Sequence, residues 1–417
     1  MRHPLTHNGF NQLKSGHPWL LKSHFLKSFK IPTAPCLYPL GEHWFWVSPK
    51  SEICFRRLGP ASRYWPSEVF HPEDLSFDRQ PVFTLTDFEH MFLDPLGDLI
   101  TQTFRLKQSL LPSEKCFRWI FSENDLIPGL IADLYEQDIV VQILTAPVEF
   151  FWPVIQKILI RSLTLATQKP AGGFRILEQR HNPIRKQEGL DIQNAISVEP
   201  KAIQWNGLRW LMTPGSSHQK TGAYLDQRNN HLTTLKWATH LHLKSAWDLF
   251  SFEGGFGLHL AKHGLSILSV DISARAQQTA QKNAELNNIP PQLFCIQEAD
   301  VFDFLTHQHK QKAKTDLIIL DPPPFSKQIS NRTSALKGYK DLNLRALHCL
   351  NTPGLLVTCS CSYHINPADF YQMLIQAAHD ARRSVKVLEM CGPSPDHAFH
   401  LSFPEGRYLQ AWFLLVT

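Results

Sequence analysis

The second half of the chain alternates predicted strands with predicted helices, and aspartates and glycines recur where the strands end. The predicted strands cover residues 245–250, 266–270, 292–296, 316–320 and 355–361. Such alternation indicates a parallel sheet with helices on both faces. The fourth strand is almost wholly apolar, as expected for a strand that is covered on both sides. The fold class predicted for residues 197–417 is therefore α/β, with a Rossmann-like sheet.

The strand ends carry side chains that suit a nucleoside cofactor. Ligands of open α/β sheets bind beyond the carboxyl ends of the strands. A glycine turn lets the backbone approach a ligand closely, and a carboxylate about twenty residues later suits the two hydroxyls of a ribose. The residues at or near such ends are Asp248, Gly254, Gly255, Asp271, Asp300 and Asp321.

The glycine spacing does not suit a nicotinamide dinucleotide. Counted from Gly255 and Gly257, the third glycine position holds Leu260, where a dinucleotide site needs Gly or Ala. A smaller nucleoside cofactor without a pyrophosphate fits better, and S-adenosylmethionine is the obvious candidate. Each residue also has a structural explanation, such as a tight turn at Gly254 or a helix cap at Asp271. As an ordered set after successive strands, they favour the cofactor.

Length and pattern divide the chain into three predicted domains. The 417 residues suggest two or three domains at about 150 residues each, and 43% hydrophobic with 19% charged residues excludes a disordered chain. Short predicted strands broken by Pro and Gly indicate a small β domain over residues 1–75. Residues 76–196 mix predicted helices with strands, a central α+β domain. The α/β domain covers residues 197–417.

Several classes of protein are not expected. No apolar run approaches the roughly 18 residues that span a membrane, and residues 1–10 lack the apolar region of a secretory signal. The eight cysteines contain no CxxC pair, which favours free thiols in a reducing cytoplasm. The 21 histidines show no metal-ligand spacing. We therefore expect a cytoplasmic protein with neither membrane nor metal.

Basic charge is concentrated near the N-terminus. Residues 1–70 carry nine basic and three acidic side chains, a net +6 that leaves −1 for the rest of the chain. Cations neutralise phosphates and flat rings stack on bases, so this mixture suits RNA or single-stranded nucleic acid. A small β domain with an aromatic core and a solvated basic face explains the segment equally well. The interleaved aromatics are Trp19, Phe25, Phe29, Trp44, Phe45, Trp46, Phe55, Tyr64 and Trp65.

Seven segments together resemble a known family, the 23S rRNA cytosine-carbon-5 methyltransferases, which join an RNA-binding PUA domain to a class I methyltransferase domain. The resemblance covers nearly the whole chain and is strongest after residue 215. Its segments are GHPWL (16–20), RKQEG (185–189), KTGAYLDQR (220–228), DLFSFEGGFG (248–257), DPPPF (321–325), GYKDLN (338–343) and CSCS (359–362).

The resemblance implies a seven-stranded sheet, S-adenosylmethionine as cofactor, and 23S rRNA or an assembling large ribosomal subunit as partner. It places the methionine part of the cofactor against residues 248–257, the ribose at Asp271, the adenine at Asp300 and the floor of the active site at Asp321. The cofactor residues expected within 248–257 are Asp248, Phe250, Gly254 and Gly255.

Glu253 departs from the family, which usually has Thr in this loop. A carboxylate there either pairs with the ammonium of the cofactor or repels its carboxylate. We expect Glu253 to permit binding and to alter affinity.

Methylation of cytosine carbon 5 requires a cysteine. The carbon is barely nucleophilic until a thiolate adds to carbon 6, so covalent catalysis splits a difficult step into easier ones. The resemblance places the nucleophile at Cys361, and the carboxyl of Asp321 suits the nitrogen-3 edge of the base. Side chains on a strand alternate, so Cys359 is expected on the same side as Cys361, as a buried small hydrophobe.

The expected substrate residues each have two interpretations. Phe325 either stacks on an extruded base or packs after the proline-stiffened loop. Tyr224, Asp226 and Arg228 line the cleft entrance, or Asp226 and Arg228 form a mutual surface pair. Lys340 either contacts phosphate or belongs to a solvated helix face.

Two other functions remain open from the sequence. A related methyltransferase that modifies a guanine nitrogen uses a similar DPPxF loop and needs no thiol. A catalytically decayed RNA-binding or ribosome-assembly protein is the other alternative, with Glu253 as a sign of decay. The sequence also leaves a homodimer possible.

Overall fold

The computed structural model describes residues 4–40, 43–59, 83–194, 198–213, 221–325 and 332–417, which form two compact units. The first unit comprises Met1–Pro200, Met212–Ala223 and Pro395–Gly406. The second comprises Lys201–Leu211, Tyr224–Ser394 and Arg407–Thr417. In the described part of the chain, no helix is long and apolar enough to cross a bilayer.

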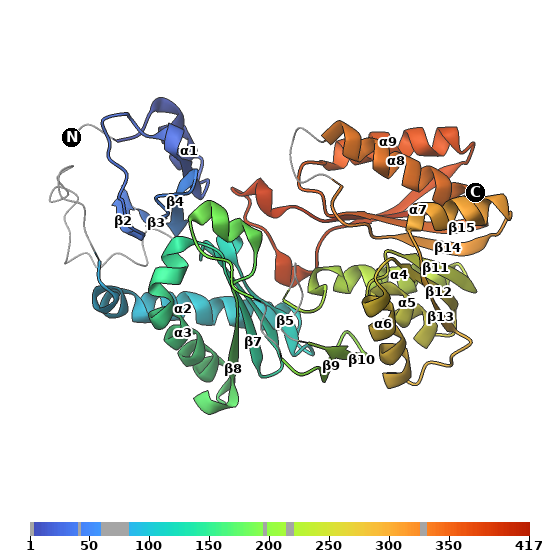
Figure 1. The fold of residues 1–417 in the computed structure, drawn as a ribbon, viewed down its shortest axis with the longest axis horizontal. Helices are drawn as coiled ribbons and strands as arrows, with labels where there is room; N and C mark the ends of the chain where they lie inside the picture. The colour runs from blue at the N-terminus through green and yellow to red at the C-terminus, as the bar shows by residue number, and fades with distance from the viewer. Residues whose placement is uncertain (1–3, 41–42, 60–82, 195–197, 214–220, 326–331) are drawn as a thin grey trace. The chain divides into compact units, whose positions relative to one another are not determined.

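The N-terminal part of the first unit is a four-stranded antiparallel sheet in the order β1-β4-β3-β2, with a short helix beside it (Figure 1). The predicted strands are confirmed, whereas the helix was not predicted. It begins after Thr6, whose hydroxyl accepts a hydrogen bond from the Gly9 N–H. The elements are α1 (His7–Lys14), β1 (Trp19–Leu21), β2 (Cys36–Leu40), β3 (His43–Val47) and β4 (Ile53–Leu58).

Most of the described aromatics of this segment belong to the core, so the interpretation that they stack on bases is wrong for them. Phe25, Trp44, Phe45, Trp46 and Phe55 are all at most 7% exposed. A ring that is enclosed by protein cannot receive a base. Tyr64 and Trp65 lie outside the described residues.

The rest of the first unit packs two long helices against a second four-stranded sheet, in the order β5-β6-β7-β8. The predicted helices are confirmed, and the first continues through Pro95. Strand β8 was not predicted. The sequence pattern over residues 188–210 also predicts strands, but residues 188–194 and 198–200 are not strand. The elements are α2 (Leu85–Leu110), β5 (Cys116–Phe121), β6 (Leu130–Tyr135), β7 (Asp138–Ile143), α3 (Ala146–Thr167) and β8 (Arg175–Gln179).

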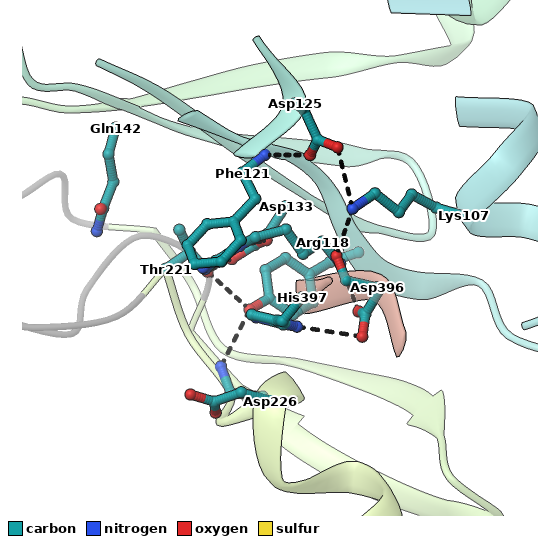
Figure 2. Close-up of polar contacts among 12 residues, drawn as sticks. Lys107, Arg118, Phe121, Asp125, Asp133, Gln142, Thr221, Asp226, Asp396 and His397 are labelled. Carbon is teal, nitrogen blue, oxygen red and sulfur yellow. Dashed lines mark hydrogen bonds and ion pairs between the residues drawn. The ribbon is translucent and has the colours of Figure 1, made fainter. Parts of the chain in front are cut away.

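A buried polar network binds two distant segments to this sheet (Figure 2). Arg118 pairs with both carboxylate oxygens of Asp133 at 2.7 and 2.8 Å, and Asp133 also accepts from the Thr221 hydroxyl. The Arg118 backbone N–H donates to Asp396 at 2.8 Å, and the Lys107 ammonium donates to the Asp396 carbonyl at 2.7 Å. Segments 212–223 and 395–406 are therefore part of the first unit.

The second unit is the predicted α/β fold, a seven-stranded sheet in the order β13-β12-β11-β14-β15-β17-β16. β11 to β15 are parallel, and β17 is antiparallel to both of its neighbours. The strands are β11 (Ser245–Leu249), β12 (Ser266–Asp271), β13 (Phe294–Glu298), β14 (Thr315–Leu320), β15 (Leu350–Ser360), β16 (Val385–Cys391) and β17 (Gln410–Val416).

Helices cover both faces of this sheet, with α4 to α6 on one side and α7 to α9 on the other (Figure 1). The start of α6 follows ordinary capping chemistry: the hydroxyl of Ser273 accepts a hydrogen bond from the Ala276 N–H. The helices are α4 (Arg228–His240), α5 (Gly255–Lys262), α6 (Ala274–Leu286), α7 (Val301–Lys310), α8 (Arg332–His348) and α9 (Pro367–Asp380). A hairpin of β9 (Lys201–Trp205) and β10 (Leu208–Met212) precedes them.

Candidate active site

The strand order reverses between β11 and β14, which are hydrogen-bonded neighbours. Chain connections leave the sheet in opposite directions at such a point and open a crevice beyond the strand ends. Asp248 lies near the end of β11, and Asp321 follows β14 directly, where its N–H donates to the Leu249 carbonyl. The sequence-predicted carboxylates of these strands therefore meet at one crevice.

Asp248 is a buried carboxyl, 1% exposed, that holds the glycine turn. Its Oδ2 accepts from the Gly257 N–H at 2.8 Å, and a Cβ at Gly257 would lie 2.9 Å from the same oxygen. The Oδ1 atom has no partner among the described residues. The pKa of Asp248 is raised to about 7, mainly by burial and also by the Asp321 and Asp271 carboxylates, against the opposing Gly257 hydrogen bond. The orphaned oxygen is suited to a cationic or hydrogen-donating ligand.

The loop after β11 has a backbone that non-glycine residues rarely adopt. Phe250 and Phe252 have φ of 60° and 49°, and Gly254 has φ of 90°. Asp271 helps to hold this shape, because one of its oxygens accepts from the Phe252 N–H at 2.9 Å and the other from the Ser273 N–H at 2.8 Å. The loop is therefore a fixed cradle of backbone groups.

Glu253 lies within this cradle. Burial raises its pKa to about 7, and the Arg275 guanidinium partly opposes the shift. Its carbonyl accepts from Asn283 at 3.4 Å. A carboxyl with a pKa near 7 is partly protonated at neutral pH, so a cation that binds beside it changes its protonation state strongly.

Asp300 lies just beyond β13 and is exposed. It caps α7, where its Oδ1 accepts from the N–H groups of Phe302 and Asp303 at 2.8 and 3.1 Å. The structure thus gives this exposed residue a helix-capping role just beyond the carboxyl end of β13.

Cys361 directly follows β15 and is half-buried. Its thiol donates to the Pro322 carbonyl at 3.7 Å, so it lies beside the residue that follows Asp321. Cys359 is fully buried, and burial raises its pKa well above the ordinary value. The expectation that Cys359 is a buried thiol is confirmed.

Two tyrosines complete the surroundings: Tyr339, which lies in the GYKDLN segment, and Tyr408, which no sequence pattern indicated. The phenol of Tyr339 lies 3.0 Å from the Ser362 hydroxyl and accepts from the Ser360 hydroxyl at 3.1 Å, so it bonds both neighbours of Cys361. Tyr408 donates to Asp226 Oδ2 at 2.6 Å. The sequence contained no signal for Tyr408 and indicated no specific role for Tyr339, because each acts through a partner far along the chain.

Tyr224 belongs to the same group of side chains. Burial raises the pKa of its phenol, and the charges that raise it further include Asp321, Asp226 and Cys361. Its ring meets Phe252 edge to face, with centroids 5.2 Å apart. Tyr224 therefore lies between the cofactor cradle and the cysteine.

The other expected substrate residues have defined partners. Asp226 and Arg228 are 3% and 2% exposed, so the interpretation as a mutual surface pair is wrong. Arg228 lies over the Trp205 ring at 5.6 Å. Phe325 packs on Tyr339 with centroids 4.6 Å apart, and Lys340 forms an ion pair with Asp380 at 2.8 Å.

Comparisons with known proteins show the family of the chain. A ribosomal RNA large subunit methyltransferase I from Aeromonas salmonicida is 35% identical over 70% of this chain and 73% of its own length. The enzyme of the same name from Shewanella denitrificans is 37% identical over 70% of this chain and 72% of its own length. The chain belongs to the ribosomal RNA large subunit methyltransferase I family.

Two further comparisons concern the fold and the cofactor half. A protein from Streptococcus mutans described as a SAM-dependent methyltransferase superposes with a TM-score of 0.73 at 17% identity, over 99% of both chains. A family described as RNA cap guanine-N2 methyltransferase matches residues 243–328. The fold is that of a class I methyltransferase, and S-adenosylmethionine is the cofactor. The orphaned Asp248 oxygen and the cradle after β11 fit it.

Proposed function

We propose that the protein methylates carbon 5 of a cytosine in large-subunit rRNA, through a covalent bond between Cys361 and the base. The observation that carries the proposal is the position of the Cys361 thiol, 3.7 Å from the Pro322 carbonyl at the crevice between β11 and β14. An enzyme that methylates an atom that is already nucleophilic, such as a ring nitrogen, needs no thiol at this position.

The proposed chemistry begins with the Cys361 thiolate, which adds to carbon 6 of the cytosine and makes carbon 5 nucleophilic. Asp321 holds a proton at the nitrogen-3 edge, where charge changes during the addition. When bound, the cofactor supplies an electrophilic methyl group. Transfer of the carbon-5 proton to water, and return to Asp321 of the proton that it gave to nitrogen 3, then let the Cys361–carbon 6 bond break, which frees the thiolate and restores the aromatic ring.

The cofactor residues follow from the cradle. In this proposal the cradle with Asp248, Phe250, Gly254 and Gly255 receives the methionine part, and Asp271 receives the ribose. Asp300 lies at the next strand end for the adenine. Support comes from the free Oδ1 of Asp248 and from the positive φ angles of the loop.

The proposed RNA partner is supported by the N-terminal lysines rather than by the aromatic rings. Arg56 is buried and pairs with Glu188 at 2.8 Å, so it is not available to RNA. The exposed basic side chains among the described residues of this segment are Lys14, Lys22, Lys27, Lys30 and Lys50. We propose that this PUA-like segment, residues 1–75, contacts phosphates. Residues 76–196 form the central domain and 197–417 the catalytic domain, apart from the segments Met212–Ala223 and Pro395–Gly406, which belong to the first unit.

Deletion of the N-terminal segment is a poor test, because Trp44 and Trp46 share one hydrophobic core with Phe88 and Phe92 of α2. The triple substitution Lys22→Gln/Lys27→Gln/Lys30→Gln removes charge alone. This variant is expected to bind RNA more weakly. The slope of log affinity against log salt concentration should become shallower by about 0.7 to 0.9 for each phosphate that the protein no longer neutralises. An unchanged slope would reject the RNA role of this segment.

The function is tested by nucleoside mass spectrometry of rRNA from a strain that lacks the protein. The expected result is one missing 5-methylcytosine in large-subunit rRNA, restored by the wild-type protein and not by Cys361→Ala. Cys295→Ala is the matched control, since Cys295 is an exposed free thiol on β13. Restoration by Cys361→Ala would exclude the covalent route.

A second candidate is methylation of a guanine nitrogen, which the match of residues 243–328 to a guanine-N2 methyltransferase family favours. That match ends before Cys361, so it concerns the cofactor half and the DPPPF loop. A missing N-methylguanosine in the same experiment, with Cys361→Ala fully active, would establish this alternative. If calorimetry shows that this protein binds no S-adenosylhomocysteine, the alternative of a catalytically decayed RNA-binding or ribosome-assembly protein would be supported instead.

A further inference from the structure

Basic side chains from four segments converge at the amino-terminal edge of the seven-stranded sheet. His309 lies in the last turn of α7, Lys314 directly precedes β14, His348 ends α8, and Arg383 lies between α9 and β16. We call these four residues the basic edge cluster. Asp321 lies at the opposite end of β14, so the cluster is separate from the crevice.

The side chains of the cluster are held by one another and by nearby backbone. The rings of His309 and His348 are stacked at a tilt, with centroids 4.8 Å apart. The Lys314 ammonium donates to the carbonyl of His348. Arg383 donates to the Thr352 hydroxyl at 2.5 Å and to a backbone carbonyl of β15 at 2.7 Å. Their charges are therefore fixed in place, which lowers the entropy lost on binding an anion.

The electrostatics show that the basic groups of the cluster lie close to one another. Burial lowers the pKa of His348, and His309, Lys314 and Arg383 lower it further. Burial also lowers the pKa of Lys314, and Arg383 adds to the shift. His309 and Lys314 are exposed. An anion that bound here would relieve this repulsion.

Helix capping explains only part of the arrangement. A basic residue in the last turn of a helix interacts favourably with the helix dipole, which accounts for His309 and His348 individually. Lys314 and Arg383 lie outside the helices, yet they add charge at the same place. Further exposed basic residues border the cluster in sequence: Lys310, Lys312, Arg382 and Lys386.

We propose that the basic edge cluster binds phosphates of the RNA substrate. This second contact lies at the amino-terminal ends of the parallel strands, whereas the crevice lies at their carboxyl ends. This inference rests on the proposed function in taking RNA as the substrate. β14 spans six residues, so the cluster and Asp321 lie about 20 Å apart. An RNA that reaches both must extend well beyond the nucleotides around its target, as a large folded RNA does.

The test compares Lys314→Gln/Arg383→Gln with the wild type. Glutamine removes the charge and keeps a donor for the carbonyl hydrogen bonds. Binding of a large-subunit rRNA transcript is measured from 50 to 300 mM salt, beside a short hairpin that carries the target cytosine. The expected result is a log–log salt slope lower by about 1.5 for the transcript and unchanged for the hairpin.

Two controls make the result specific. Lys169→Gln/Lys282→Gln removes two exposed positive charges elsewhere and is expected to leave the slope as in the wild type. Lys310→Gln/Lys312→Gln removes exposed charges beside the cluster and is expected to lower the slope, even if the first variant does not fold. If both Lys314→Gln/Arg383→Gln and Lys310→Gln/Lys312→Gln give the salt slope of the wild type, the inference is overturned. The same result is expected if the cluster binds an acidic protein instead of RNA. A wild-type protein that methylates no rRNA would instead refute the proposed function.

Discussion

The thiol of Cys361 lies 3.7 Å from the carbonyl oxygen of Pro322, although 39 residues separate them in the chain. The contact joins the ends of β14 and β15, which are paired neighbours in the sheet. It brings a half-buried thiol beside the loop that Asp321 begins. A thiol and a carboxyl group thus follow two neighbouring strands, which is the arrangement that the proposed mechanism requires.

Tyr339 is predicted to position Cys361. Burial raises the pKa of its phenol to about 12, so the hydroxyl is neutral and bonds both Ser360 and Ser362. Tyr339→Phe is expected to reduce kcat by about 10- to 100-fold, since a small misplacement of a reacting group has that effect. KM for the cofactor should hardly change. Tyr371→Phe, on an exposed ring of α9, is the control and should be fully active; a loss of thermal stability with normal kcat would show a purely structural role for Tyr339.

Asp321 is predicted to handle a proton rather than only to bind. Asp321→Asn keeps the size of the side chain and removes the exchangeable acid, so kcat is expected to fall by about 10² to 10⁴. Single-turnover assays at saturating cofactor check the rate, and calorimetry with S-adenosylhomocysteine checks that the site is intact. Asp303→Asn, an exposed residue of α7, serves as the control. A rate within threefold of the wild type would contradict this role.

Glu253 and Asp248 are predicted to make cofactor binding pH-dependent. Both carboxyls have a pKa raised to about 7, mainly by burial. Between about pH 4 and 7 the unfolded carboxyls are ionised while the folded ones keep their protons, so these groups lower stability as pH rises through that window. A cationic ligand lowers both pKa values and releases protons near pH 7. A decrease of one pKa unit corresponds to a tenfold gain in affinity.

Calorimetry in buffers of different ionisation enthalpy measures this proton release. S-adenosylmethionine should bind more tightly at pH 8 than at pH 6, and S-adenosylhomocysteine, which lacks the sulfonium charge, should gain less. Glu253→Gln should reduce the pH effect, and Glu253→Thr should change the affinity as well. An affinity that is the same in Glu253→Thr and in the wild type would remove the proposed role of this carboxyl.

The buried pair of Arg118 and Asp133 is predicted to stabilise the first unit strongly. Asp133→Ala leaves a buried guanidinium uncompensated, which is expected to cost about 3 to 5 kcal/mol. The exposed pair of Lys157 and Glu89, 3.1 Å apart, is the matched control, and Glu89→Ala should cost less than about 1 kcal/mol. Thermal unfolding followed by circular dichroism measures both; similar shifts would show that burial does not decide the effect.

Local sequence signals predicted the catalytic fold well. Apolar runs and glycine turns indicated the strands and helices from residue 245 onward, because short-range chemistry determines each of them. The carboxylates at strand ends were also predictable, since parallel strands bring their carboxyl ends to one edge.

Contacts between distant segments could not be predicted. The Tyr408–Asp226 hydrogen bond spans 182 residues, and the basic edge cluster combines residues from four segments. The N-terminal aromatics illustrate a different limit, because composition does not distinguish a ring that faces solvent from one in a core. Trp44 and Trp46 are both 1% exposed.

The most direct test of the proposed mechanism uses an rRNA transcript in which cytidines are replaced by 5-fluorocytidine. Fluorine at carbon 5 cannot leave as a proton does, so the bond between the enzyme and carbon 6 should persist. The expected result is a cofactor-dependent protein–RNA adduct that survives denaturing electrophoresis and maps by mass spectrometry to Cys361. An active wild-type enzyme that forms no adduct, or an adduct at any other residue, would contradict the covalent mechanism.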